Sequence, residues 1–193
     1  MGLREHDFRP DYNKNDHDIA GEFYLPAMKS SVRYDRISGY FGSTIYIIAW
    51  SVLQEFVSNG GKIRVICSPC ISDVDKEAMT EGYSALNDTI IREALAKELN
   101  ELFSLDSLSK PARVLAGLIA EGVLDVKIAV PKNGIEADLE RLFHDKVGIF
   151  TDSQGDSVGF RGSMNETYQG LSSGGNLESI DVFPSWIDSR DSF

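Results

Sequence analysis

Hydrophobic and polar residues alternate with two different periods along the chain. Residues 62–67 (KIRVIC) place β-branched residues at every second position before Pro69, which predicts a strand that ends in a loop. Residues 45–56 repeat large apolar side chains at helical spacing, and the sequence NGG at 59–61 ends that run. We therefore predict a helix that begins after Ser43, whose side chain we expect to cap it, and a strand that follows.

The rest of the chain continues this alternation. An acidic, helix-rich region spans residues 73–105, and a further helix begins at Lys110 and ends before Gly122. The expected strands are residues 36–41, 62–67, 123–130, 146–150, 157–160 and 178–183, with a polar connector at 132–142. Because strands and helices alternate early and strands cluster late, we predict an α/β fold with a mixed β-sheet flanked by helices.

The composition is that of one globular domain preceded by a short polar segment. Of 193 residues, 42% are hydrophobic and 25% are charged, which argues against disorder. A domain of this length buries about 70% of the surface of its unfolded chain and needs no disulfide or metal to fold. Residues 1–18 mix both charge signs with few apolar side chains, and we expect a mobile arm there and the domain at 19–193.

The net charge makes one class of function less favoured, namely proteins that bind polyanions over their whole surface. It is −11, from 19 basic and 30 acidic residues, and argues against a protein that binds polyanions over its whole surface. A local basic site remains compatible with it. The N-terminal region has no apolar signal-peptide stretch, and the most apolar run, residues 45–57, is shorter than the ~20 residues of a membrane-spanning helix. We expect a cytoplasmic protein with no membrane partner.

Two cysteines, Cys67 and Cys70, form a C-S-P-C sequence after a predicted strand. A redox-active pair needs a helix N-terminus directly after the first cysteine, and Pro69 favours an exposed loop instead. A zinc site would need a second pair of Cys or His ligands. We therefore expect neither dithiol chemistry nor a metal at this sequence.

The first candidate for chemistry is the H-x-K sequence at His144, Asp145 and Lys146. At strand spacing, residues two apart point to the same side, so the imidazole and the ammonium would share a pocket and Asp145 would face away. A neutral imidazole suits a nucleophile, and an ammonium binds an anionic oxygen. Taken alone, such a histidine is more often structural or simply exposed.

The second candidate is the sequence G-S-M-N at residues 162–165, which begins sixteen residues after Lys146. The glycine permits a tight turn at which the backbone approaches a ligand, and Ser163 and Asn165 offer short donors for phosphate oxygens. The alternative is that one of these two residues caps a short helix that begins near Glu166.

H-x-K followed by G-S-x-N resembles the signature of the phospholipase D superfamily. Residues 162–186 (GSMNETYQGLSSGGNLESIDVFPSW) are similar to the region after the motif in single-motif phospholipase D-like nucleases. They are most similar to the N-terminal phospholipase D-like domain of certain bacterial and archaeal helicases of the DEAD/DEAH class. Upstream, SGYFGSTIYIIAW and GGKIRVICSP resemble the first strand, the helix and the second strand of that fold.

The resemblance implies a phosphodiesterase that uses no metal and no cofactor. His144 would attack phosphorus and form a phosphohistidine intermediate. Lys146 and Asn165 would bind the non-bridging oxygens and stabilise the charge that develops on them. Ser163 would assist through its hydroxyl.

A carboxylate and a second histidine complete the implied site. Glu178 is expected to orient His144 because its N-x-E-S context matches the family, and Glu166 is the competing residue. The leaving oxygen needs a second histidine as proton donor, but His6 and His17 lie in the polar segment without a lysine two residues on. We therefore expect a symmetric homodimer in which His144 of each chain meets at the two-fold axis.

One position departs from the family. The full signature has an aspartate five residues after the lysine, where this chain has Thr151, followed by Asp152. Single-motif nucleases of the family often lack that aspartate, so we leave Asp152 out of the site and expect a structural role for it.

The resemblance implies a nuclease that acts on nucleic acid, DNA above all. We expect the chain to be the N-terminal piece of a longer protein with a C-terminal helicase domain. The main alternative is a catalytically inactive module of the same fold that serves dimerisation or nucleic-acid binding. A phospholipid hydrolase is less favoured, because such enzymes usually carry two copies of the motif.

Overall fold

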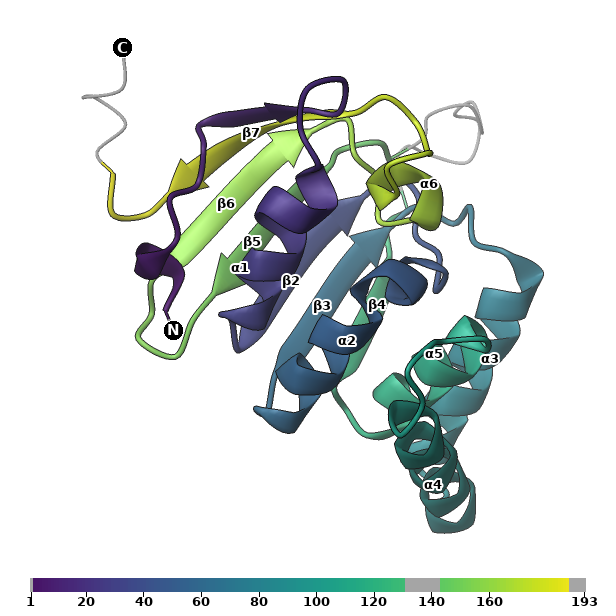
Figure 1. The fold of residues 1–193 in the computed structure, drawn as a ribbon. Coiled ribbons are helices and arrows are strands. Elements are labelled where there is room, and N and C mark those ends of the chain that lie inside the picture. Colours follow the sequence, from purple (N-terminus) through teal and green to yellow (C-terminus); the bar gives the residue numbers. More distant parts are fainter. Residues whose placement is uncertain (1, 131–142, 188–193) are drawn as a thin grey trace.

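A seven-stranded mixed sheet runs through the structure (Figure 1). The computed structural model describes residues 2–130 and 143–187. The strand order is β1-β7-β6-β5-β2-β3-β4, in which β2, β3 and β4 are parallel and the remaining pairs are antiparallel. The strands are β1 (Asp11–Asn13), β2 (Arg33–Ser38), β3 (Lys62–Cys67), β4 (Leu124–Ile128), β5 (Val147–Thr151), β6 (Ser157–Gly162) and β7 (Ser179–Pro184). The predicted mixed sheet is confirmed.

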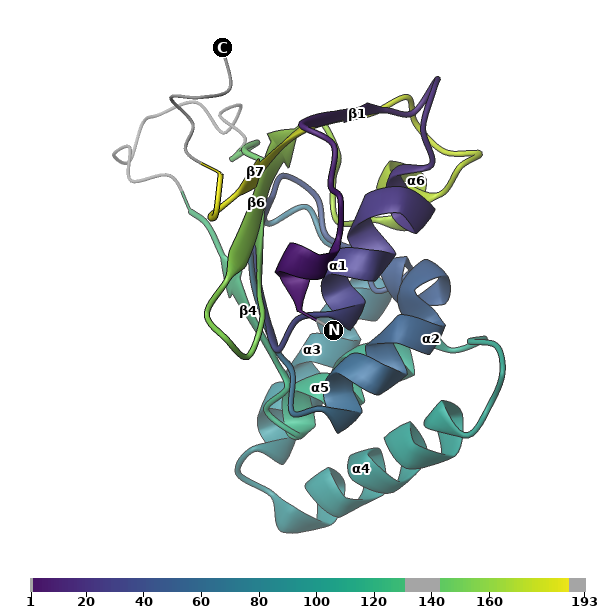
Figure 2. The ribbon, with the colours of Figure 1, turned by 60° about the vertical axis from the view of Figure 1, so that its left-hand side comes forward.

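The six α-helices lie on one side of the sheet (Figure 2). They are α1 (Leu25–Lys29), α2 (Ile45–Ser58), α3 (Asp73–Ala85), α4 (Thr89–Phe103), α5 (Pro111–Ala120) and α6 (Tyr168–Leu171), and a π-helical turn (Ala20–Tyr24) leads into α1. Tyr34, Ile63 and Val65 are buried between the sheet and these helices, whereas Ile66 and Ile149 on the opposite face are exposed. None of the described helices is long and apolar enough to cross a membrane.

Local sequence accounts for the parallel half of the sheet. Strand β3 has the predicted bounds, and its buried and exposed residues alternate along its whole length. Gly60 and Gly122 have φ values of +78° and +62°. They follow the C-terminal ends of α2 and α5, where glycine readily adopts the left-handed conformation that ends a helix, and the chain then enters β3 and β4. The expected polar connector at 132–142 lies outside the described residues.

Two expectations for the β2–α2 region need correction. Strand β2 begins at Arg33 and ends at Ser38, because Gly39, Tyr40 and Phe41 leave the sheet as a loop. Thr44, and not Ser43, precedes the first turn of α2, without a side-chain cap. The Ser43 backbone N–H instead donates to Asp75 at 3.3 Å, which ties the loop to α3.

The segment at residues 1–18, which we expect to be a mobile arm, packs against the rest of the domain over its described residues, from Gly2 onward. Strand β1 pairs antiparallel with β7, with Tyr12 opposite Ile180. Leu3 is fully buried, and its backbone N–H donates to Asp152 at 3.0 Å. The buried side chains of Leu3 and Tyr12 and the pairing with β7 thus contribute to holding this segment, although its composition is mostly polar.

We predict that Leu3→Ala destabilises the domain strongly. Removal of a fully buried leucine side chain costs about 2–5 kcal/mol of unfolding free energy. Chemical denaturation measures this value, and Leu86→Ala is the matched control, since Leu86 is half exposed and its truncation should change stability by less than about 0.5 kcal/mol. Equal stability of the two variants would mean that the N-terminal segment does not contribute to the fold.

Candidate active site

Four chain segments meet at the carboxyl ends of β2 and β3. They are the loop after β2 (residues 39–44), the segment before β5 (143–146), the loop after β6 (163–167) and the residues that lead into β7 (176–178). An isolated bridge joins Phe41 to Glu166, and the Gly162 backbone N–H donates to the Lys146 carbonyl at 3.3 Å. The H-x-K and G-S-x-N sequences are therefore neighbours in space.

His144 and Lys146 are in direct contact. The Lys146 Nζ atom lies 2.8 Å from His144 Nδ1 and 2.7 Å from the His144 carbonyl oxygen. The pair precedes β5 instead of lying within it, and the two side chains are nonetheless in contact. His144 and Asp145 are exposed, whereas Lys146 is buried. Burial lowers the pKa of the Lys146 ammonium, the charge of Glu178 opposes this shift, and the charge of Arg36 adds to it.

Ser163 and Glu178 form the second pair at the site. The Ser163 hydroxyl donates to Glu178 Oε2 and accepts from the Ser179 backbone N–H at 3.1 Å. Glu178 is buried and Ser163 is exposed. Among the hydrogen bonds of the described residues, none joins Glu178 to His144, so the structure places this carboxylate on the serine and not on the imidazole.

Asn165 is held by the loop after β2. Its Oδ1 atom accepts from the Tyr40 backbone N–H at 3.1 Å, which leaves the amide NH2 group available to a ligand. A Cβ atom added at Gly39 would lie 2.9 Å from His144 Cδ2 and 3.3 Å from Asn165 Oδ1. The absence of a side chain at Gly39 thus allows His144 and Asn165 to pack on the same piece of backbone.

The competing carboxylate, Glu166, is enclosed beneath the site. It accepts hydrogen bonds from Tyr24 at 2.6 Å, from Tyr34 at 2.9 Å and from Arg36 Nε at 2.8 Å. Burial and the charge of Glu166 raise the pKa of both tyrosines well above its usual value, so their hydroxyls stay protonated donors. With its carboxylate occupied in this way, Glu166 does not contact His144.

Sequence reasoning missed Arg36, Tyr34 and Tyr24. The available signal was the alternation in β2, because Tyr34, Arg36 and Ser38 occupy every second position and all three are buried. An arginine on the apolar side of a strand requires a carboxylate partner. The sequence does not indicate which carboxylate that is.

Asp152 has the structural role that the sequence predicts. It accepts hydrogen bonds from the backbone N–H groups of Leu3, Gln154 and Asp156 at 2.9–3.0 Å and so fixes the turn between β5 and β6. Thr151 is the last residue of β5, at the opposite end of that strand from His144. The aspartate position of the full family signature therefore lies away from the site.

The C-S-P-C sequence shows no sign of an activated thiol. Cys67 is fully buried at the end of β3, and burial raises the pKa of its thiol to about 11. Cys70 is exposed in the loop that follows. Within residues 2–130 and 143–187, no group of three His, Cys, Asp or Glu side chains lies close enough to hold a metal ion.

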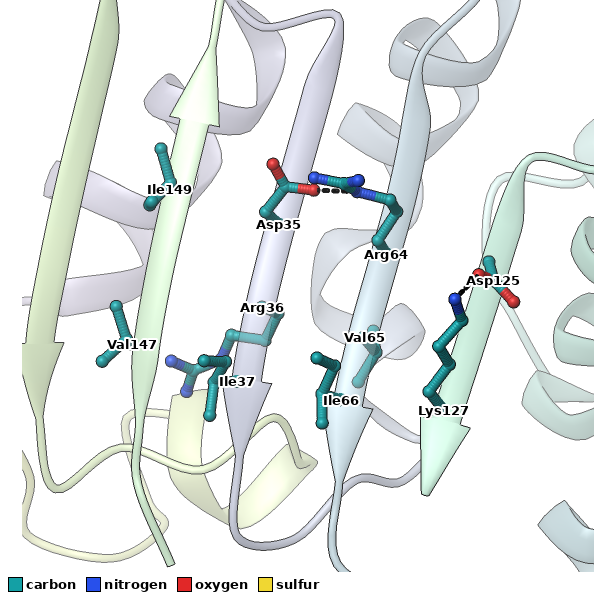
Figure 3. A pocket seen from close by; sticks show the side chains of 10 residues that line it. All are labelled: Asp35, Arg36, Ile37, Arg64, Val65, Ile66, Asp125, Lys127, Val147 and Ile149. Carbon is teal, nitrogen blue, oxygen red and sulfur yellow. Dashed lines mark hydrogen bonds and ion pairs between the residues drawn. The ribbon is translucent and has the colours of Figure 1, made fainter. Parts of the chain in front are cut away.

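A separate hollow of about 280 Å³ lies on the face of the sheet opposite the helices (Figure 3). Ile37, Ile66 and Ile149 contribute its apolar lining. Four of the charged side chains around it form two pairs, Arg64 with Asp35 and Lys127 with Asp125, as the dashed lines in Figure 3 mark. The hollow does not contain the residues of either motif.

Comparisons with known proteins identify the fold. No protein-family model matches the sequence, and no curated protein matches it. Among solved structures, NucT from Helicobacter pylori is similar, with a TM-score of 0.50 and 13% identity over 94% of this chain and 86% of that chain. Yeast tyrosyl-DNA phosphodiesterase gives a TM-score of 0.47 and 11% identity over 89% of this chain and 30% of that chain. The chain therefore has a fold similar to that of NucT, and this is an α/β fold of the kind that the resemblance of its motifs predicts.

Proposed function

We propose that this domain hydrolyses phosphodiester bonds of nucleic acid, DNA above all, through a phosphohistidine at His144. The observation that carries the proposal is the convergence of the H-x-K and G-S-x-N side chains at one edge of the sheet. An imidazole, an ammonium, a hydroxyl and a side-chain amide lie there. The fold supports the proposal, because both motifs occupy one site in a phospholipase D-like architecture.

Lys146 and Asn165 bind the non-bridging oxygens of the phosphodiester. The Lys146 ammonium supplies charge, and the Asn165 NH2 group can donate to a phosphate oxygen while Tyr40 engages its Oδ1. The Asn165 amide is held by Tyr40 before substrate arrives, whereas the Lys146 ammonium exchanges its hydrogen bond to His144 for one to the phosphate, and both donors then stabilise the charge that grows on the phosphorus oxygens. Ser163 adds a hydroxyl that Glu178 orients.

The contact between Lys146 and His144 sets the order of events. A charged Lys146 donates to Nδ1, and the proton of a neutral imidazole is then on Nε2. When a phosphate draws the ammonium onto its own oxygens, Nδ1 is free to take the proton and Nε2 becomes the nucleophile. Substrate binding thereby activates His144.

Two balanced displacements complete the reaction. In the first, His144 Nε2 forms a bond to phosphorus, the bond from phosphorus to the leaving oxygen breaks, and a second histidine protonates that oxygen. In the second, the second histidine removes a proton from water, the water oxygen attacks phosphorus, and the bond from phosphorus to His144 Nε2 breaks. Histidine is regenerated, and one phosphodiester has become one phosphate monoester and one hydroxyl.

The second histidine comes from a second copy of the chain. His6 Nε2 lies 2.7 Å from the Ser30 hydroxyl, before the start of β2 and at the far end of the sheet from His144. His17 Nδ1 accepts from the Asn13 backbone N–H at 3.2 Å. Neither reaches His144, so a symmetric homodimer that brings two His144 side chains together supplies the missing acid.

The acidic surface leaves most of the affinity for nucleic acid to another part of the protein. A net charge of −11 repels a polyanion, and the ammonium of Lys146 is a small positive charge against it. A C-terminal helicase domain in the full-length protein fits this requirement. It would hold the nucleic acid while the present domain cleaves it.

The second candidate function is a catalytically inactive module of this fold. The observation that favours it is the absence, among the described contacts, of a carboxylate on His144, since Glu178 bonds Ser163 and Glu166 bonds Arg36. Such a module would dimerise or bind nucleic acid without hydrolysis.

Cleavage that resists EDTA separates the two candidates. We expect the protein to cleave DNA and a model phosphodiester in excess EDTA, and His144→Ala to abolish this activity because no other group can form the intermediate. His17→Ala is the matched control and should retain full activity. Equal background cleavage by the wild type and His144→Ala would favour the inactive module.

The mass of the protein in solution tests whether two copies of the chain form the active site together. We expect a particle of twice the 21.3 kDa chain mass at micromolar concentration, and a cleavage rate per chain that falls on dilution as the dimer dissociates. Sedimentation equilibrium and assays over a dilution series measure the two quantities. A monomer that cleaves at an undiminished rate would contradict the two-histidine scheme.

A further inference from the structure

Tyr40 lies beside the proposed nucleophile and leaves part of its ring in solvent. Its ring centroid is 6.1 Å from that of His144, and the two ring planes are nearly perpendicular, at 87°. The residue is 39% exposed, whereas its chain neighbours Gly39 and Phe41 are buried. In a perpendicular pair the edge of one ring meets the face of the other, so the imidazole leaves at least one face of the tyrosine ring uncovered.

The backbone of Tyr40 is fixed by hydrogen bonds from both of its polar groups. The N–H donates to Asn165 Oδ1 at 3.1 Å. The carbonyl oxygen accepts from the Ser38 hydroxyl at 2.6 Å and from the Glu166 backbone N–H at 3.2 Å. Among the hydrogen bonds of the described residues, none involves the Tyr40 hydroxyl. The chain therefore holds the ring at the site, although the ring itself makes no polar contact that would explain its position.

A nucleobase close to the scissile phosphate lies within reach of this ring. A nucleic-acid strand rises about 3.4 Å per nucleotide. A ring centred 6.1 Å from the imidazole that would bond phosphorus is therefore within about two nucleotides of the scissile bond. Every nucleobase has a π face, and proteins commonly bind single strands by stacking bases on exposed aromatic side chains.

Stacking on Tyr40 also agrees with the charge of the chain. The net charge of −11 opposes contacts to phosphates, but it does not oppose contact with an uncharged base. A base inside a duplex is covered by its neighbours and has to leave the stack before it can meet an aromatic side chain. Single strands offer such bases without that cost, so the ring favours a single-stranded ligand.

We propose that Tyr40 is a base-binding residue of the site and that the substrate class is single-stranded nucleic acid, with one base near the scissile phosphodiester stacked on the tyrosine ring. The proposal rests on the proposed function, to which it adds a preference among substrates. It concerns the side chain alone, because Tyr40→Ala keeps the backbone N–H that Asn165 accepts.

Binding is measured in a His144→Ala background, which lacks the proposed nucleophile. Fluorescence anisotropy with a short labelled DNA single strand should show binding about 5- to 150-fold weaker for Tyr40→Ala, as loss of one stacked base produces. Tyr40→Phe and Tyr40→Trp keep an aromatic face and should bind within about twofold of the parent. Phe183→Ala removes an exposed ring near the end of β7 away from the site, and it is the matched control that should bind as the parent does. Equal binding by Tyr40→Ala and the parent, or no binding by either, would overturn the proposal.

Two further ligands identify the part of the nucleic acid that Tyr40 contacts. A strand of tetrahydrofuran residues keeps the phosphates and lacks every base, and a blunt duplex keeps its bases stacked. We expect Tyr40→Ala to change the affinity for each of them by less than about twofold. An equal loss of affinity for the strand without bases would overturn base stacking, and an equal loss for the duplex would overturn the preference for single strands.

A second variant covers the case in which Tyr40→Ala fails to fold. Tyr40→Leu keeps an apolar side chain without an aromatic face and should show the same loss of binding. The mass in solution separates a base from a second copy of the chain as the partner of this ring. Each Tyr40 variant should have the mass of the wild type, and a variant with a different mass would make the ring a contact between two copies and overturn the proposal.

Cleavage in the presence of His144 distinguishes failure of this proposal from failure of the proposed function. Tyr40→Ala should lower kcat/KM on the DNA single strand by about 5- to 150-fold and leave cleavage of the strand without bases unchanged. An equal fall on both strands would mean that Tyr40 acts through His144, which overturns the base site. Binding independent of Tyr40 refutes the base site alone, whereas Tyr40-dependent binding without His144-dependent cleavage refutes the function alone.

Discussion

The buried ion pair between Arg36 and Glu166 is the constraint on which the geometry of the site depends. Its guanidinium belongs to β2 and its carboxylate to the loop after β6, so it fixes two segments that are 130 residues apart in sequence. Tyr24 and Tyr34 supply the remaining hydrogen bonds to the carboxylate, and each does so from a different element of the helix-covered side. The polar network is expensive to bury, and the three hydrogen bonds that the Glu166 carboxylate accepts fix the position of the loop. Asn165 lies in that loop, so the same ion pair determines where Asn165 lies at the edge of the sheet.

Much of the fold can be predicted from local sequence. The parts that cannot be predicted depend on contacts between residues that are far apart in the sequence. Strand β3 and helix α5 agree with the predicted positions, because alternation and helical spacing report directly which side of an element is buried. Strand β1 has three residues and owes its existence to β7, and no local pattern reports such a pairing. The two glutamates illustrate the same limit at the site. Spacing along the chain cannot show that Glu166 meets Arg36 while Glu178 meets Ser163.

Four side chains of the candidate site form two hydrogen-bonded pairs. Lys146 bonds His144 Nδ1, and Glu178 bonds the Ser163 hydroxyl. A phosphodiester that takes the ammonium and the hydroxyl as ligands would release the imidazole. The proposed reaction thus couples recognition of an anionic oxygen to activation of the nucleophile, and it requires Lys146 to remain charged in a buried position.

Covalent capture of the intermediate tests the central claim most directly. An end-labelled oligonucleotide mixed with the protein in EDTA and quenched in neutral detergent should leave label attached to the protein. The bond should be labile to acid and stable to alkali, as a phosphoramidate is, and peptide mass spectrometry should place it on His144. His144→Ala should carry no label. Cleavage by the wild type with no protein-bound label, or label on a residue other than His144, would contradict the account.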